Sequence, residues 1–391
     1  MLLRVRERWS ISAETYQRIT LASLVALTLV VLTGAAVRLT GSGLGCPNWP
    51  KCTSSSFHPP LNSYSLIEFT NRVLIFAVSA AAILAVAGAF LRAPLGPRRR
   101  DLKLLAILLP FGVLAQAVVG GESVLYKLAP GWVMAHYWLS MLILIAAFAL
   151  WRRSRMEPED IARPGADRAT VIEVRLISAL AGVVIVLGSA STAAGPHAGA
   201  SGTGQFVHRL SFWGAATLSR MVHLHGYLVT IIGLGTVGLW WLARRRGASP
   251  ELVQTLALTC LLLAAQGIVG ITQYALELPS ELVWVHVSLA TLTWVGYVHV
   301  WAAAGRLPAR SERPARVKAA LPAGRAAKGA DGVRPEPADR AHAEPADRAH
   351  AEPADRAHAE PAEGAHAVPA EGAHAVPADR AHAVPAEGAR R

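Results

Sequence analysis

Eight separate apolar stretches, each about as long as a membrane is thick, constrain the fold of this chain more than any other feature. A helix needs roughly 20 such residues to cross a hydrocarbon core of about 30 Å. The composition agrees, because 53% of the residues are hydrophobic and only 16% are charged, whereas soluble domains carry about 25% charge. We therefore expect an all-α, polytopic membrane protein with transmembrane helices at 19–40, 67–91, 103–120, 132–151, 172–193, 217–242, 252–273 and 282–303.

Basic residues gather at alternate ends of these stretches. The first 303 residues carry 24 Lys and Arg against 13 Asp and Glu. Short cytoplasmic loops are enriched in Lys and Arg, so the excess predicts a multi-pass plasma-membrane protein with both termini in the cytoplasm. Nucleic-acid binding is not expected, since no basic stripe with interleaved aromatics is present. The basic segments are 1–18, the cytoplasmic N-terminus, 92–103, the linker 152–171, and 244–246.

The last segment, 304–391, differs from the rest of the chain. It contains no aromatic residue, and from Glu336 onward an octapeptide such as EPADRAHA recurs with proline at every repeat. A sequence of this kind cannot bury a core. We expect a disordered cytoplasmic tail, with metal chelation by its six histidines as the alternative.

Two cysteines, Cys46 and Cys52, fall in the first outward-facing loop in the string CPNWPKC. Disulfides persist in oxidising compartments, so a bridge between them is the favoured interpretation. A pair of free thiols or a weak metal pair is the alternative, because no further cysteine is available to complete a zinc site.

An internal duplication relates the first four stretches to the last four. Gln116 and His136 are 20 residues apart, as are Gln266 and His286, and the strings VVLTGAAVRLTGSG and VIVLGSASTAAGPH align at an offset of 154. The same offset pairs Asn71 with His225. The repeat therefore predicts two pseudo-symmetric four-helix bundles, 19–151 and 172–303.

The second bundle offers two histidines, His225 and His286, near the outward ends of facing helices. Ionisable side chains at membrane depth are costly and usually functional, and two imidazoles can bind a heme iron from both sides. Axial ligation of a heme is the favoured interpretation, and a hydrogen bond between the two histidines is the alternative. His223 is a second candidate ligand, but it lies on another face of the same helix.

The first bundle differs, because its corresponding pair is Asn71 and His136 and it alone carries an acid, Glu68, one helical turn before Asn71. A carboxyl group in apolar surroundings can shuttle protons during a reaction. An ion pair with Arg72 is the alternative for Glu68. Three arginines near outward helix ends are candidates for contacts to heme propionates, with interfacial snorkelling as the alternative: Arg38, Arg72 and Arg220.

Several strings of this sequence resemble those of the heme A synthase family over roughly residues 20–303. They are GAAVRLTGSGLGCPNWPKC, IEFTNR, QAVVGGESVLYKLAPGWVMAH, GPHAG and QGIVGITQYALELPSELVWVH, in the family's order. Members of this family oxidise the C8 methyl group of heme O to a formyl group by successive hydroxylations, giving heme A for terminal cytochrome oxidases.

The resemblance implies a role for each candidate residue. His225 and His286 would bind a permanent heme B as iron ligands, and His136, with Asn71 and Arg72 nearby, would hold the substrate heme O. Glu68 would be the acid needed for turnover, and Cys46 and Cys52 would match the family's outer-loop cysteine pair. One position departs from the family, whose pattern is Glu-x-x-His-Arg, because this chain has Asn71 at the histidine position.

The same resemblance points to partners that the residues do not identify. They are the protoheme farnesyltransferase that makes heme O and an unidentified electron acceptor. Two other classes remain alternatives: a di-heme membrane electron carrier of the cytochrome b type, and a transporter, since internal repeats also occur in transporters.

Overall fold

A computed structural model of the chain describes residues 10–91 and 99–309, and these residues belong to one compact unit. Within these residues eight long helices are present and no β-strand, and all eight are long and apolar enough to cross a membrane. This confirms the all-α, eight-helix expectation. The helices are α2 (Ala13–Leu39), α3 (Ser63–Leu91), α4 (Arg100–Leu125), α5 (Pro130–Ser154), α7 (Arg168–Ala194), α8 (Thr217–Arg245), α9 (Pro250–Ala275) and α10 (Ser280–Ala304).

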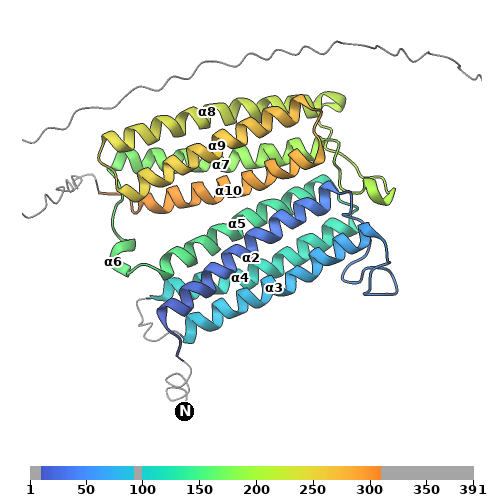
Figure 1. Ribbon diagram of the computed structural model, residues 1–391, viewed down its shortest axis with the longest axis horizontal. Helices are drawn as coiled ribbons and strands as arrows, with labels where there is room; N and C mark the ends of the chain where they lie inside the picture. The colour runs from blue at the N-terminus through green and yellow to red at the C-terminus, as the bar shows by residue number, and fades with distance from the viewer. Residues whose placement is uncertain (1–9, 92–98, 310–391) are drawn as a thin grey trace, which may run out of the picture. The chain divides into compact units, whose positions relative to one another are not determined.

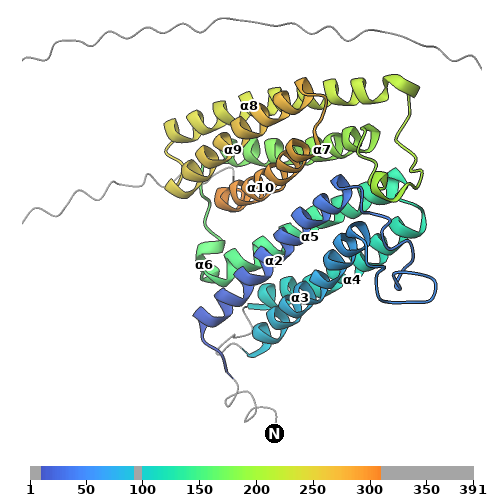
Figure 2. The same cartoon turned by 45° about the vertical axis from the view of Figure 1, so that its right-hand side comes forward.

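The eight helices form two bundles of four, as the repeat predicted. In the first, α2 packs against α3 and α5, and α4 against α3 and α5; in the second, α7 and α9 take the corresponding places around α8 and α10. Figures 1 and 2 show the second bundle lying beside the first. The bundles meet where α10 packs against α2 and α5, and where α5 packs against α7.

Indole N–H groups link the two bundles across this interface. Trp138 donates to Ser189 Oγ at 2.8 Å, Trp284 to the Leu32 carbonyl at 3.0 Å, and Trp294 to the Met141 carbonyl at 3.0 Å. Trp138 and Trp294 are half-buried, where leaving a polar group unpaired costs free energy, whereas Trp284 is exposed.

The duplication extends to the details of the loops. The α4–α5 loop and the α9–α10 loop each contain two consecutive non-glycine residues at positive φ, Lys127 and Leu128 in one and Glu277 and Leu278 in the other. The second residue of each pair donates its backbone N–H at 2.7 Å to a carbonyl five residues earlier. Both turns therefore place the next helix in the same way.

Several helix boundaries differ from the expected ones. α4 and α9 extend five and two residues past the predicted ends at 120 and 273, and the linker 152–171 contains a short helix, α6 (Pro158–Ile161). α7 begins at Arg168 because Asp167 accepts the Thr170 N–H at 2.8 Å, which is an N-cap. The predicted tail lies outside the described residues from 310 onward, as do residues 1–9.

Candidate functional site

A cavity of about 920 Å³ reaches into both bundles and is lined by most of the residues singled out from the sequence. Its size is at the upper end of the range for small-molecule sites. The sequence candidates that line it are Arg38, Glu68, Asn71, Arg72, His136, His223, His225 and His286.

The four repeat-related positions have the same register in their helices. Asn71 and His225 are each the ninth residue of α3 and α8, whereas His136 and His286 are each the seventh of α5 and α10. At 1.5 Å per residue, these side chains lie about two turns into each helix. The repeat thus brings four equivalent positions to one level of the molecule.

In the second bundle, the imidazole rings of His225 and His286 are neighbours in an edge-to-face arrangement, with their centroids 6.4 Å apart and their planes at 72°. Bonds from a metal to imidazole nitrogen are about 2 Å long, so two rings on opposite sides of one metal have centroids roughly 6 Å apart. The spacing between these two rings therefore suits a shared metal. They do not hydrogen-bond to each other.

Each of these two rings has its Nδ1 buried without a partner. His286 Nε2 lies 3.1 Å from Gln266 Nε2. A metal-ligating histidine donates the N–H of its other ring nitrogen to a neighbouring oxygen, and the amide oxygen of Gln266 is itself buried without a partner. A buried nitrogen without a partner is costly unless a ligand fills the role.

Glycines allow three imidazoles to approach neighbouring helices closely. A Cβ atom on Gly120 would lie 2.8 Å from His136 Cε1, one on Gly188 would lie 2.9 Å from His225 Cε1, and one on Gly270 would lie 3.0 Å from His286 Cε1. The sequence repeat contained all three glycines, but their contacts with the imidazoles were not predicted.

The first bundle holds one imidazole where the second holds two. His136 Nδ1 is also buried without a partner. At the position that the repeat pairs with His225, Asn71 Oδ1 accepts from Thr33 Oγ1 at 2.8 Å. Thr33 was not predicted to take part in the site, because its role depends on a contact between helices that the repeat does not encode.

Glu68 is 5% exposed and is bound from two directions. Its Oε2 accepts the Cys46 N–H at 2.7 Å, and its Oε1 accepts from Arg72 Nη2 at 2.6 Å. The ion pair with Arg72, the alternative interpretation of the sequence, is therefore present, and Glu68 nevertheless lines the cavity. A carboxylate with charged and backbone donors is strongly held in one orientation.

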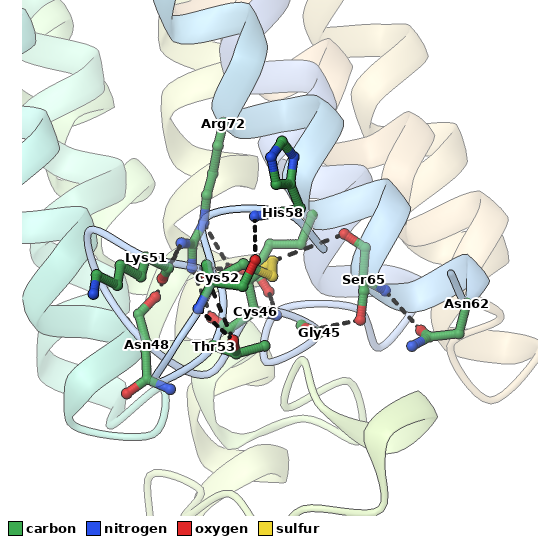
Figure 3. Close-up of a disulfide and its surroundings, with 12 residues drawn as sticks. Gly45, Cys46, Asn48, Lys51, Cys52, Thr53, His58, Asn62, Ser65 and Arg72 are labelled. Carbon is green, nitrogen blue, oxygen red and sulfur yellow. Dashed lines mark hydrogen bonds and ion pairs between the residues drawn. A yellow bond between two sulfur atoms is a disulfide. The ribbon is translucent and has the colours of Figure 1, made fainter. Parts of the chain in front are cut away.

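Arg72 also fastens the loop that follows α2. Its guanidinium donates to the carbonyls of Cys46 at 2.7 Å, Asn48 at 3.0 Å and Lys51 at 3.3 Å. Figure 3 shows Arg72 reaching from its helix to this loop. The guanidinium has several donors in a fixed plane, which suits one side chain to several carbonyls.

The predicted disulfide between Cys46 and Cys52 is present, with the two Cα atoms 4.3 Å apart. Both residues are buried, and the loop is joined to the start of α3 by a 2.6 Å hydrogen bond from Ser65 Oγ to the Gly45 carbonyl. The bridge therefore closes the loop whose backbone binds Glu68 and Arg72 (Figure 3).

The remaining candidates lie in three different settings. Arg38 lines the cavity with its Nε buried and without a partner, and its Nη2 donates to the Thr192 carbonyl at 3.4 Å. Arg220 is exposed, lies over the ring of Trp213 and does not line the cavity. His223 is exposed and donates to the Ser219 carbonyl at 2.7 Å, so His225 rather than His223 faces His286.

These side chains do not form a site for a bare metal ion. In the part of the chain that the structure describes, no three His, Cys, Asp or Glu side chains are grouped so as to hold one. Pairs of imidazoles suit a metal whose other ligands come from a macrocycle, such as heme iron.

Comparisons with known proteins identify the family of this chain. The model of the COX15-CtaA family, described as cytochrome oxidase assembly protein, matches residues 17–298. The chain is 33% identical over 130 residues to a heme A synthase of Lysinibacillus sphaericus, a match that covers 33% of this chain and 41% of the relative. It is 28% identical over 261 residues to a heme A synthase of Symbiobacterium thermophilum, covering 63% of this chain and 82% of that protein.

A third relative carries a different name. A protoheme IX farnesyltransferase of Thermus thermophilus is 30% identical over 292 residues, which cover 69% of this chain and 45% of that protein. This chain thus spans less than half the length of the Lysinibacillus and Thermus relatives. Because the family match extends over most of the chain and reaches each of the eight long helices, this protein belongs to the COX15-CtaA family of cytochrome oxidase assembly proteins, the heme A synthase family.

Proposed function

We propose that this protein is a membrane oxidoreductase that oxidises the C8 methyl group of heme O to a formyl group, producing heme A. The observation that carries the proposal is the asymmetry of the cavity. One bundle offers two facing imidazoles 6.4 Å apart, whereas the other offers a single imidazole and a buried glutamate. The relatives named heme A synthase support this assignment.

The resident cofactor in this proposal is heme B, held by His225 and His286 in the second bundle. The residues fit such a group, because each imidazole has a buried nitrogen without a partner. Gly188 and Gly270 leave room for the Cε1 ends of the two rings. When bound, heme B supplies one-electron redox chemistry.

The substrate heme O is assigned to the first bundle, near His136. There Asn71 and Arg72 line the same wall, and the guanidinium of Arg38, with Nε unpartnered, suits a propionate. Arg220 is not included in this assignment, because it lies over Trp213 outside the lining. The protein's part is to bind and orient the methyl group.

Glu68 is assigned the proton traffic of the reaction. Converting a methyl group and one water to a formyl group releases four protons and four electrons, through an alcohol and a gem-diol that loses water. A carboxylate at the cavity wall can accept such protons, and Arg72 with the Cys46 N–H holds Glu68 in place for this. The electrons pass to an acceptor that neither the residues nor the relatives identify.

The enzyme that makes heme O is the partner we propose. In the Thermus relative named for farnesyl transfer, the region similar to this chain is part of a longer polypeptide of which it makes up 45%. A physical link between two such activities would pass a poorly soluble heme from one site to the next.

The orientation in the membrane also belongs to this proposal. The Lys and Arg excess at 1–18, 92–103, 152–171 and 244–246 supports a plasma-membrane location with cytoplasmic termini. The cavity would then open near the outer face, beneath the disulfide-closed loop.

Heme conversion in cells tests the proposed function. The chain is expressed in a host that makes heme O but no heme A, and the extracted hemes are separated by chromatography. We expect heme A with the wild type and none with His136→Ala. An exposed-residue variant, His208→Ala, serves as the matched control and should form heme A. Absence of heme A from wild-type cells that contain the folded protein and heme O would contradict the proposal.

A further inference from the structure

The four repeat-related positions around the cavity differ in one respect. At three of them an imidazole packs on a glycine of the adjacent helix, within 3.0 Å of where a Cβ would be. The fourth glycine is Gly34, which the repeat pairs with Gly188. A Cβ on Gly34 would meet nothing within 4 Å, although Gly34 lines the cavity. The position where an imidazole would lie is therefore open space.

Asn71, the side chain at this fourth position, is also hydrogen-bonded to Thr33. Asn71 Oδ1 accepts from Thr33 Oγ1 at 2.8 Å, whereas the repeat places Leu187, which has no hydroxyl, opposite Thr33. The Thr33 hydroxyl and the Asn71 amide therefore have no counterpart in the second bundle. The oxygen of Asn71 is occupied, and its Nδ2 carries the donors of the amide.

No other side chain on this wall can replace the missing imidazole. Helices α2 and α3, which form the wall, contain no histidine, cysteine or methionine. Glu68 lies one turn before Asn71, but both of its oxygens accept hydrogen bonds, from Arg72 and from the Cys46 N–H. The side of the cavity formed by α2 and α3 therefore offers Gly34 and the amide of Asn71, and no side chain that could take the place of the imidazole.

We propose that the heme in the first bundle has His136 as its only protein ligand, and that its face toward Gly34 and Asn71 is open to a small neutral molecule such as water or carbon monoxide. This inference rests on the proposed function, which places a heme in that bundle. The heme between His225 and His286 has protein ligands on both faces and is closed to such molecules. The amide of Asn71 would donate to a molecule bound at the open face.

Carbon monoxide binding to the reduced, purified protein tests this inference directly. Hemes are extracted and counted in the same samples, and the fraction that binds carbon monoxide is read from the difference spectrum. We expect wild-type protein with two hemes per chain to bind one carbon monoxide, and its ferric form to give one high-spin and one low-spin signal. Asn71→His should keep both hemes, bind no carbon monoxide and give two low-spin signals.

A second variant approaches the open face from the other helix. Gly34→Leu fills the space above Gly34 without supplying a ligand, so the heme should stay high-spin and its carbon monoxide affinity should fall at least tenfold. His225→Asn is the matched change in the second bundle, and it should add a second carbon monoxide site.

Each result separates the inference from the proposed function. Two hemes per chain with no carbon monoxide bound would overturn the inference and leave the two-heme assignment standing. Unchanged carbon monoxide binding in both Asn71→His and Gly34→Leu would place the open face elsewhere and also overturn it. A chain that holds heme only between His225 and His286, in a host that makes heme O, would overturn the proposed function and this inference together.

Discussion

Glu68 has two roles at the scale of a single residue, since it binds the loop after α2 and lines the cavity. Glu68→Gln keeps the size of the side chain and one of its two hydrogen-bond acceptors, but the amide cannot accept a proton from the reaction. We expect heme content to be unchanged and heme A formation to fall about 100-fold, which is the low end of the effect of general acid–base catalysis.

The amount of heme A relative to heme O in extracts of the purified protein measures this effect. Glu281→Gln is the matched control, because Glu281 is exposed in the first turn of α10 and does not line the cavity. It should leave the ratio unchanged. Wild-type heme A formation in Glu68→Gln would show that this carboxylate moves no proton in the reaction.

Two histidines on α8 are close in sequence and very different in the structure. His225 faces His286, whereas His223 is exposed and bonds to the Ser219 carbonyl. We expect His225→Ala to lose the low-spin heme B absorbance and His223→Ala to keep it, with heme content measured per chain after extraction. If His225→Ala kept the low-spin absorbance and His223→Ala lost it, the heme ligand on α8 would be His223 and not His225.

Glycine packing sets the distance between helices at the scale of the element. In Gly188→Ala the new Cβ would lie 2.9 Å from His225 Cε1, so the ring or α7 must move. Crowding of this kind costs about 1–3 kcal/mol, and we expect heme B to be lost on purification at a higher rate. Gly34→Ala is the matched change, since nothing lies within 4 Å, and its second-bundle heme should be retained as in the wild type.

The rate of heme loss is measured as the fall in the ratio of low-spin heme to protein after dilution into an excess of a heme-free protein that captures heme. Equal rates of heme loss from the two variants would show that the contact between glycine and imidazole does not support heme binding.

The repeat was the part of the sequence that carried most structural information at this scale. It predicted the two bundles, which the structure confirms, and it placed His225 and His286 at equivalent levels, where their rings are neighbours. Its power comes from counting along helices, because equal spacing in two similar bundles gives equal heights.

The repeat did not predict features that depend on contacts between helices. The hydrogen bond from Thr33 to Asn71 could not be read from spacing. Arg220 lies near the start of α8, but its guanidinium lies over Trp213, and the direction of this side chain depends on how the 3-10 turn Gly214–Ala216 leads into α8. The paired positive-φ residues at Lys127 and Leu128 carry no glycine signal.

The whole molecule has an orientation that labelling can test. The loop that carries the disulfide and the loop after α8 lie at opposite ends of the bundle helices (Figure 1). We expect Leu61→Cys, at a residue 94% exposed, to react with a membrane-impermeant thiol reagent in intact cells, and Arg245→Cys to react only after the membrane is opened. The reverse pattern would invert the topology and move the cavity mouth to the cytoplasmic face.

The central claim is that one chain holds a permanent heme B in one bundle and oxidises heme O in the other. Chromatographic identification of the hemes extracted from wild-type protein, purified from a host that makes heme O, tests it most directly. We predict heme B together with heme O or heme A. Heme B alone at two per chain would instead indicate an electron carrier, and absence of heme would contradict the account as a whole.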